Sequence, residues 1–215
     1  MIKISPSILS VDLLKLEEEI KSLDKSGADY IHIDIMDGHY VPNITFGPNI
    51  VKSIRKITSK ILDVHLMIKP VDPYIEAFIE SGSDIISFHP EADRRPEEII
   101  EKINKANIKA GIAIHPNQKI ENFEHLFPLI KQIIVMTVVP GFGGQRFMDD
   151  QVKKIKDLKK IREINNYDYD ISVDGGINNK TGKICINNGV DVLSVGSYLL
   201  SQENKNYEKI ISSLR

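Results

Sequence analysis

The length, composition and charge of the chain favour one globular domain that acts on a small molecule. The chain has 215 residues, 41% of them hydrophobic and 27% charged, so it has ample material for a core and little tendency to disorder. Its 30 acidic and 28 basic residues are spread along the sequence and leave a formal charge of −2. This balance argues against nucleic acid or a membrane surface as a partner.

The sequence carries no sign of export, of a membrane span or of a reactive thiol. No run approaches the roughly 18 apolar residues that a membrane span requires. The chain begins with a strand-like segment, residues 2–5, without signal or transit composition, so we expect a cytoplasmic protein. The single cysteine, Cys185, lies between two isoleucines in a helical pattern, which indicates a buried structural thiol.

Short apolar runs typical of strands alternate along the chain with amphipathic stretches typical of helices. The strands are expected at residues 4–9, 30–36, 61–67, 85–89, 110–114, 133–138, 171–174 and 192–195. The helices are expected at residues 13–23, 73–79, 96–106, 149–164 and 181–188. This alternation predicts an α/β protein that forms a single (β/α)8 barrel over residues 1–215.

Glycine-rich segments late in the chain favour this closed barrel over a doubly wound open sheet. In a doubly wound sheet the phosphate-binding glycines normally follow the first strand. Here such segments follow the last three predicted strands, as Gly141-Phe142-Gly143-Gly144, Gly175-Gly176 and Gly196-Ser197. Any one of these segments could be a simple turn at the entry to a helix, but three in succession match the way TIM barrels bind phosphate. We therefore predict a TIM barrel of the phosphate-binding type.

Polar residues alternate with aliphatic ones in several predicted strands, which sends the polar side chains to the inside of the barrel. The residues expected inside are His32, Asp34 and Met36 in the second strand, Asp63, His65 and Met67 in the third, and Asp170, Ser172 and Asp174 in the seventh. A lone buried histidine or aspartate is usually a hydrogen-bonded core residue, but this convergence indicates a site. Two imidazoles and two carboxylates predict one divalent cation, with zinc favoured and iron(II), manganese or cobalt also accepted.

Five sequence segments occur in order from one end of the chain to the other. They are residues 5–10 (SPSILS), 32–38 (HIDIMDG), 63–67 (DVHLM), 140–145 (PGFGGQ) and 173–177 (VDGGI). In these segments the chain closely resembles the ribulose-phosphate 3-epimerase family. The resemblance implies interconversion of D-ribulose 5-phosphate and D-xylulose 5-phosphate in the pentose phosphate pathway. It also implies a sugar phosphate as ligand and a homo-oligomer.

The resemblance also implies a role for each site residue. The cation would be held by His32, Asp34, His65 and Asp174, and Asp34 and Asp174 would be the two proton-transfer residues. Ser7 and His65 would contact the sugar. Three methionines would pack against a flat intermediate without donating a proton, although core packing is the simpler explanation for them; they are Met36, Met67 and Met136. The phosphate end would be surrounded by Gly141, Phe142, Gly143, Gly144, Gly175, Gly176, Gly196 and Ser197.

These residues suit inversion at a carbon beside a carbonyl group. The reaction removes a proton from one face of C3 and returns one to the other face through a planar enediolate, so it needs two acid–base groups. Asp34 and Asp174 can supply them from two different strands. A cation would stabilise the developing negative charge, which matters because no lysine or arginine appears on these strands.

Two alternatives follow from the same residues. A 3-epimerase of a hexulose 6-phosphate such as allulose 6-phosphate would share every catalytic residue. The segments Thr137-Val138-Val139 and Ile114-His115-Pro116-Asn117 depart from the pattern that is common in the family, and they bear on the shape of the sugar pocket. A non-catalytic sugar-phosphate-binding barrel would be expected to have lost part of the ligand set, which is complete here.

Lysine-dependent chemistry is disfavoured by the second predicted strand. Decarboxylases and hexulose-phosphate synthases with a related barrel carry Asp-x-Lys-x-x-Asp, whereas residues 34–39 read DIMDGH and lack the lysine. A Schiff-base aldolase would need an inward lysine at a strand end, and the near candidate, Lys69, lies two residues beyond Met67. Arg146 is interpreted as a solvated residue at a helix entry.

Overall fold

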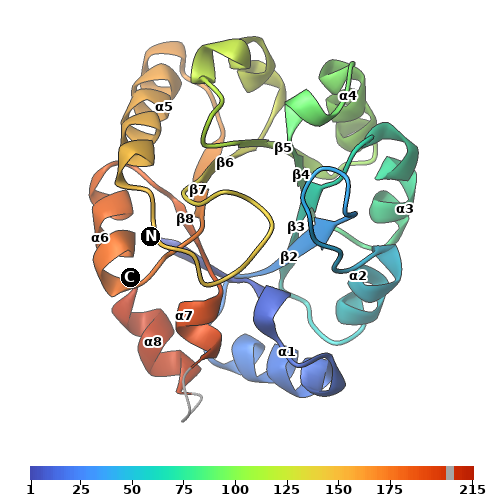
Figure 1. Cartoon of the computed structure of the whole chain (residues 1–215), viewed down its shortest axis with the longest axis vertical. Helices are drawn as coiled ribbons and strands as arrows, with labels where there is room; N and C mark the ends of the chain where they lie inside the picture. Colours follow the sequence, from blue (N-terminus) through green and yellow to red (C-terminus); the bar gives the residue numbers. More distant parts are fainter. Residues whose placement is uncertain (202–205) are drawn as a thin grey trace.

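A computed structural model describes residues 1–201 and 206–215, and within them eight parallel strands form one sheet. Each strand from β2 to β7 pairs with the next along the chain, and β8 pairs with β1, so the sheet curls into a barrel (Figure 1). The strands are β1 (Lys3–Pro6), β2 (Tyr30–Met36), β3 (Ile61–Met67), β4 (Ile85–Phe88), β5 (Lys109–Ile114), β6 (Gln132–Met136), β7 (Asp170–Asp174) and β8 (Val192–Val195). The predicted (β/α)8 barrel is confirmed.

The seam of the barrel lies between β1 and β2, the two edge strands of the sheet. An isolated bridge between Ser7 and His32 joins them beyond the end of β1. The hydroxyl of Ser7 also donates a buried hydrogen bond of 2.7 Å to Oδ2 of Asp34. The bridge and the side-chain hydrogen bond together therefore close the seam beside the predicted site.

Helices cover the outside of the barrel (Figure 1). They are α1 (Leu16–Lys25), α2 (Pro48–Arg55), α3 (Ile75–Glu80), α4 (Pro96–Lys105), α5 (Val152–Asn165), α6 (Asn179–Asn187), α7 (Ser197–Leu200) and α8 (Tyr207–Ser213). In the part of the chain that the structure describes, no helix has both the length and the apolar character that crossing a bilayer requires.

The sequence pattern missed the short elements. It did not predict α2, α7 or α8, which have eight, four and seven residues. Between β5 and β6 the chain forms 3-10 turns at Ile120–Asn122 and Glu124–Leu129, and Pro128 lacks the N–H that an α-helix needs. The first strand ends at Pro6 because the hydroxyl of Ser7 accepts the N–H of Leu9 and starts a 3-10 turn.

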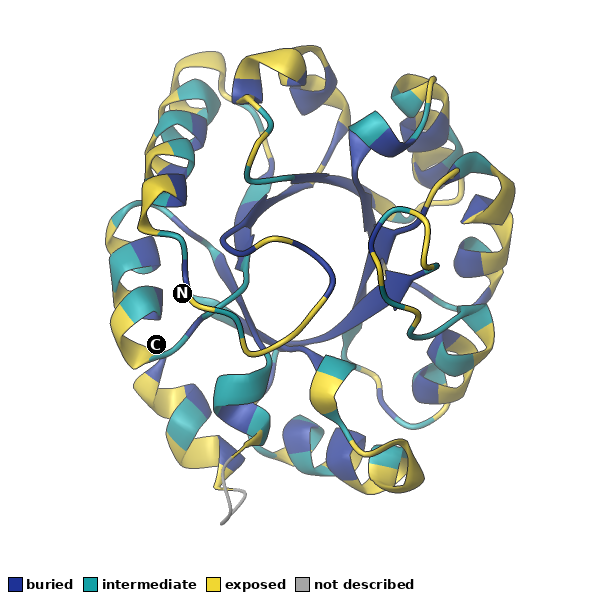
Figure 2. Ribbon diagram, in the orientation of Figure 1, coloured by how far each residue is buried: buried dark blue, intermediate teal, exposed yellow. Residues whose placement is uncertain are grey.

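Strand residues alternate between the inside of the barrel and the core that the strands share with the helices, as the sequence predicts. Ile31 and Ile33 of β2 are fully buried in the main core that the strands share with the helices. Figure 2 shows the same burial along the barrel wall and on the inner faces of the helices. Inside the barrel, Tyr30, Ile85 and Val192 form a separate apolar cluster near the start of their strands. This cluster fills the amino end of the barrel.

Buried polar side chains follow that cluster inside the barrel. Asp63 is fully buried, and its Oδ1 accepts a hydrogen bond of 2.8 Å from Nε2 of Gln132. The same nitrogen of Gln132 lies 3.2 Å from Oγ of Ser87. The second oxygen of Asp63 lies 2.8 Å from Nδ1 of His32. Because buried polar groups are costly unless they are paired, this network fixes the orientation of the His32 ring.

The buried thiol of Cys185 provides a test of the packing of α6. Cys185 is fully buried, and burial raises its pKa to about 12. The native protein at mildly alkaline pH should therefore react with a thiol reagent at least ~100-fold more slowly than the unfolded chain. Absorbance of the released chromophore, with and without denaturant, measures both rates. Equal rates would show that α6 does not pack as described.

Candidate active site at the carboxyl end of the barrel

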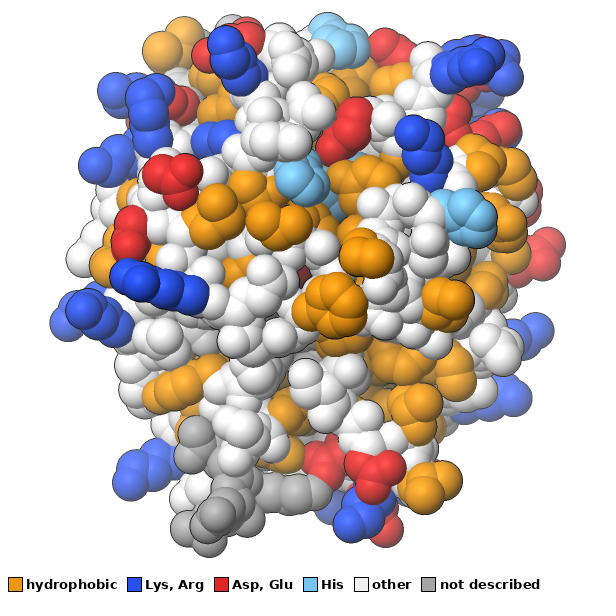
Figure 3. All heavy atoms as spheres, in the orientation of Figure 1, with side chains coloured by type: hydrophobic (Ala, Val, Ile, Leu, Met, Phe, Trp, Pro, Cys, Tyr) orange, Lys and Arg blue, Asp and Glu red, His pale blue; other side chains and the backbone are white. Residues whose placement is uncertain are grey.

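An open pocket of about 570 Å3 lies at the carboxyl ends of the strands. Hydrophobic side chains gather near the centre of this face, with charged side chains around the periphery (Figure 3). The pocket is lined by Ser7, Leu9, Ser10, Asp34, Met36, Met67, Met136, Val138, Pro140, Gly141, Phe142, Gly143, Gly144, Gln145, Asp174, Gly175, Gly176, Ile177, Ser194, Gly196 and Ser197. Apart from His32 and His65, every residue that the sequence predicts for the site lines this pocket.

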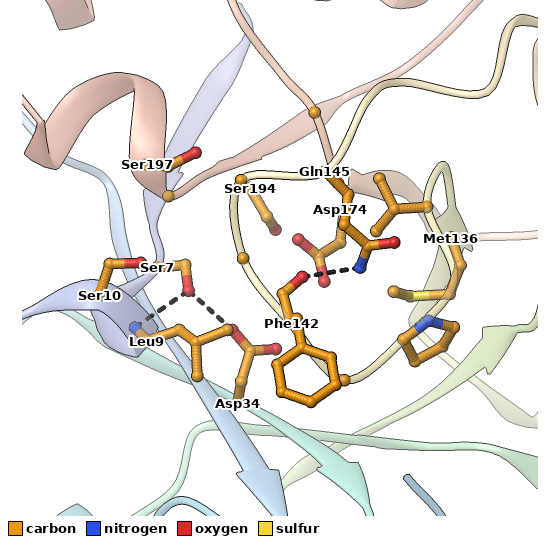
Figure 4. A pocket seen from close by; sticks show the side chains of 18 of the residues that line it. Ser7, Leu9, Ser10, Asp34, Met136, Phe142, Gln145, Asp174, Ser194 and Ser197 are labelled. Atoms are coloured by element: carbon orange, nitrogen blue, oxygen red, sulfur yellow. Dashed lines mark hydrogen bonds between the residues drawn. The ribbon is translucent and has the colours of Figure 1, made fainter. Parts of the chain in front are cut away.

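The two predicted histidines lie beneath the floor of the pocket. His32 on β2 and His65 on β3 are fully buried. Asp34 and Asp174 reach the pocket itself and point into it (Figure 4). One ligand atom from each of the four residues lies within 4.8 Å of all the others, so the group could hold a metal ion. The predicted contact of His65 with the sugar stays a prediction, because the ring lies below the pocket wall.

The distances in this cluster leave a space between two carboxylates and two imidazoles. Oδ1 of Asp34 lies 3.2 Å from Nε2 of His32 and 3.2 Å from Nδ1 of His65. Oδ2 of Asp174 lies 3.9 Å and 3.8 Å from the same two nitrogens. Each histidine therefore turns one ring nitrogen towards both carboxylates.

A divalent cation fits the donor set of this cluster. Because Nδ1 of His32 is paired with Asp63, a neutral His32 ring has its lone pair on Nε2. That Nε2 is buried and has no hydrogen-bond partner among the described residues. A lone pair that faces two carboxylates without a proton donor is the arrangement that a cation satisfies. Nitrogen and oxygen donors in this ratio suit zinc, and they also accept iron(II), manganese or cobalt.

The two aspartates differ in proton affinity when no cation is bound. Burial by itself would raise the pKa of Asp34, but the imidazoles of His32 and His65 outweigh it and hold the pKa well below its usual value. Burial raises the pKa of Asp174 to about 6, and the negative charge of Asp34 adds to this effect. Such a divergence between two carboxyl groups is typical of paired acid–base residues.

Burial and neighbouring charges also shift the pKa values of two histidines beneath the pocket, His32 and His89. Burial alone would lower the pKa of His32, but the carboxylates of Asp34 and Asp63 outweigh it and raise that pKa well above its usual value. Burial lowers the pKa of His89 to about 4, so that ring is neutral near pH 7.

The predicted methionines form the apolar part of the wall. Met36 and Met67 cluster with Val41, and Met136 belongs to a second cluster that includes Val138. All three methionines are buried. A wall of this kind can pack against a flat, electron-rich intermediate without offering it a proton.

The glycine segments form the opposite side of the pocket. Gly176 has a φ of +65°, and a Cβ there would lie 2.7 Å from the backbone nitrogen of Phe147, so this position accepts glycine alone. The segment between β6 and α5 crosses the mouth of the barrel in Figure 1. It is tied by Gln145, whose side chain donates to the carbonyl groups of Val139 and Phe142. Backbone N–H groups can therefore approach a phosphate closely here.

The two departures from the family pattern affect the pocket unequally. Thr137 is buried and donates to the carbonyl oxygens of Asp174 and Gly175, so it supports the backbone. Val138 lines the pocket, whereas Val139 is half exposed. His115, at the end of β5, has its ring 6.4 Å from that of His89. Val138 is thus the departure that shapes this pocket.

Sequence reasoning missed part of the site. It placed Asp63 inside the barrel without giving it a role, and it did not single out His89 or Gln132. Ile85, Ser87 and His89 follow the same alternation as the residues of β2, so the signal was present in the sequence.

Cation binding is expected to release more protons at acid than at neutral pH. A carboxyl with a pKa of about 6 is mostly protonated at about pH 5.5, so a cation that binds Asp174 must displace its proton there. The affinity should therefore fall more steeply below about pH 6, and roughly 0.7 proton more should leave this group at about pH 5.5 than at about pH 7.5. Calorimetry with Co²⁺ in buffers of different ionisation enthalpy counts these protons. An equal count at both pH values would contradict the role of Asp174.

Comparison with known proteins places this site in a family. The profile of the ribulose-phosphate 3 epimerase family matches residues 3–200. The chain is 45% identical over 216 residues to the ribulose-phosphate 3-epimerase of Bacillus subtilis (strain 168), and the match covers 100% of this chain and 99% of that one. It is 38% identical to the enzyme of that name from Escherichia coli (strain K12), with 99% and 94% covered.

Solved structures of other proteins share the fold at low sequence identity. A mutant tryptophan synthase α-subunit from Pyrococcus furiosus superposes with a TM-score of 0.73 at 16% identity, covering 100% of this chain and 98% of that one. KGPDC from Streptococcus mutans superposes with a TM-score of 0.72 at 15% identity, covering 100% and 97%. These likenesses concern the barrel alone. The near full-length sequence matches, together with the site geometry, show that the chain belongs to the ribulose-phosphate 3-epimerase family.

Proposed function

We propose that the chain interconverts D-ribulose 5-phosphate and D-xylulose 5-phosphate by inverting C3. The observation that carries the proposal is the pair Asp34 and Asp174, which reach one pocket from β2 and β7 and whose pKa values are shifted in opposite directions. Relatives at 38% to 45% identity carry the name of this reaction. A place in the pentose phosphate pathway, a homo-oligomer and a cytoplasmic location stay predictions.

In this proposal the two aspartates exchange protons with opposite faces of the substrate. In one direction the ionised carboxylate removes the proton from C3, and the protonated carboxyl of the other aspartate delivers a proton to the far face. Ser7 holds Asp34 in place through its 2.7 Å hydrogen bond, which leaves the other carboxylate oxygen facing the histidines. The reverse reaction uses the same groups in exchanged roles.

The residues that would hold the divalent cation are His32, Asp34, His65 and Asp174. When bound, the cation supplies Lewis-acid stabilisation of the negative charge that develops on the substrate oxygens. Asp63 orients His32 for this task from beneath the pocket floor. A complete set of donors argues against a non-catalytic binding barrel.

The pocket orients a phosphorylated sugar along one direction. The methionine side adjoins the two aspartates, so C3 and its neighbours would lie there. The glycine segments and Ser197 occupy the side of β7 and β8, where backbone N–H groups would bind the phosphate. A chain of five carbons would then span the pocket between the two ends.

Substrate preference and cation dependence can be tested on one sample. The protein as purified should convert ribulose 5-phosphate at least ~10-fold more efficiently than allulose 6-phosphate, a difference typical of one additional carbon group in a closed pocket. Removing the cation with a chelator should abolish turnover, and adding Zn²⁺, Mn²⁺ or Co²⁺ should restore it. Coupled assays and elemental analysis measure both. Preference for allulose 6-phosphate would replace the pentulose proposal with the hexulose one, and full activity in cation-free protein would exclude the metal.

The two-aspartate mechanism predicts a solvent label at C3. In heavy water the product should carry deuterium there, because the proton that one aspartate removes is not the one that the other delivers. Asp174→Asn and Asp34→Asn should each lose epimerisation by about 10²-fold or more, while each retains exchange of the C3 proton of one epimer. NMR of both pentuloses detects the exchange, and cation content must be measured in each variant. Epimerisation at the wild-type rate by either cation-loaded variant would refute the mechanism.

A further inference from the structure

His89 follows β4 directly and contacts His65 from the side away from the carboxylates. The ring of His89 is fully buried, and its Nε2 lies 3.1 Å from Nε2 of His65. The other ring nitrogen of His65, Nδ1, faces Asp34 at 3.2 Å and Asp174 at 3.8 Å. His65 therefore lies between the proposed cation position and a second imidazole.

This contact determines where both rings carry their protons. A neutral imidazole has one N–H group and one lone pair. If Nδ1 of His65 gives its lone pair to a cation, Nε2 of His65 must carry the proton and donate it across the 3.1 Å contact. Nε2 of His89 must then be the acceptor. It follows that His89 carries its own proton on Nδ1.

The surroundings of His89 suit that proton position. Its Nδ1 is buried and has no hydrogen-bond partner in the described part of the chain, and Oε1 of Glu91 lies 3.7 Å away. That separation is too long for a hydrogen bond but places an acceptor on the required side. Tyr40 stacks on His89 with 4.6 Å between ring centroids, and its hydroxyl donates to Oε1 of Glu91 at 2.9 Å. Ring and carboxylate are thus held by the same tyrosine.

We propose that His89 is the positioning residue of His65: its Nε2 accepts the Nε2–H of His65 and so holds Nδ1 towards the divalent cation. This inference rests on the proposed function, since it presupposes a cation at the site. His32 is supported differently, by the carboxylate of Asp63. Outer partners of metal-bound histidines commonly change the affinity for the metal by about 10–100-fold. A carboxylate would therefore hold His32, and a neutral imidazole would hold His65.

The test compares His89→Leu with His89→Gln in cation-free full-length protein, with Co²⁺ alone as the probe. Leucine has similar bulk but cannot accept a hydrogen bond, so the affinity for Co²⁺ should fall by about 10–100-fold. Glutamine offers an amide oxygen in place of Nε2, so its affinity should stay within roughly 3-fold of the wild type. Competition with a chelator of known affinity measures all three proteins.

The visible absorption of the Co²⁺ complex gives a second readout that a loss of packing alone would not produce. His89→Leu should shift the absorption bands, because His65 is free to rotate, whereas His89→Gln should keep the wild-type spectrum. His115→Leu is the matched control: it makes the same change at the end of the next strand, where Nδ1 accepts the backbone N–H of Asn117. The control should match the wild type in both affinity and spectrum.

The proton positions can also be observed without a leucine variant, should that variant fail to fold. Long-range ¹H–¹⁵N spectra of Zn²⁺-loaded, histidine-labelled wild type should show His89 protonated on Nδ1 and His65 on Nε2, with His89→Gln providing the assignment. A His89 ring protonated on Nε2 would overturn the proposal.

The outcomes separate this inference from the proposed function. Equal Co²⁺ affinity and equal spectra in wild type and His89→Leu would overturn the positioning role and leave the epimerase proposal intact. A wild type that binds no Co²⁺ would overturn both the positioning role and the cation part of the proposed function. Turnover of ribulose 5-phosphate by the same sample reports on the epimerase reaction independently.

Discussion

The parallel pairing of β2 with β3 is the constraint on which the site depends. In this register His32 lies opposite Asp63, and Asp34 lies opposite His65. A slip of one residue would turn the isoleucines of β2 into the barrel and the polar residues out to the helices. The two-residue period of a strand therefore makes a core and a site from one segment, with the aliphatic residues sealing the barrel wall and the polar ones meeting inside it.

Burial gives similar side chains different properties within a few ångströms. The imidazoles of His32 and His65 outweigh the effect of burial and lower the pKa of Asp34, whereas burial and the negative charge of Asp34 raise the pKa of Asp174. The same packing keeps His89 neutral, because burial lowers its pKa to about 4. Taking such groups out of water is costly unless they are paired, so the network that reaches Gln132 is part of the fold as well as of the site.

At the mouth of the barrel, above this floor, the pocket is lined by the glycine segments after β6 and β7. Asn43 donates a 2.7 Å hydrogen bond to the carbonyl of Gly141, which ties the segment that crosses the mouth to the loop after β2. At Gly175 a Cβ would lie 2.4 Å from a methyl group of Val138, so this glycine and this valine constrain each other. The departure from the family pattern at Val138 is therefore coupled to the backbone on which the phosphate is proposed to bind.

By itself the sequence determined which side chains of each strand face the barrel, because the period of a strand is local and needs no knowledge of its neighbours. The late glycine segments likewise indicated the phosphate side. Only the tertiary structure decided which inward residues touch: Asp63 supports His32, and His89 contacts His65. It also decided that His32 and His65 lie below the pocket floor. These contacts join different strands, and they depend on the stagger and tilt of the strands around a nearly closed barrel. No pattern within a single segment encodes that geometry.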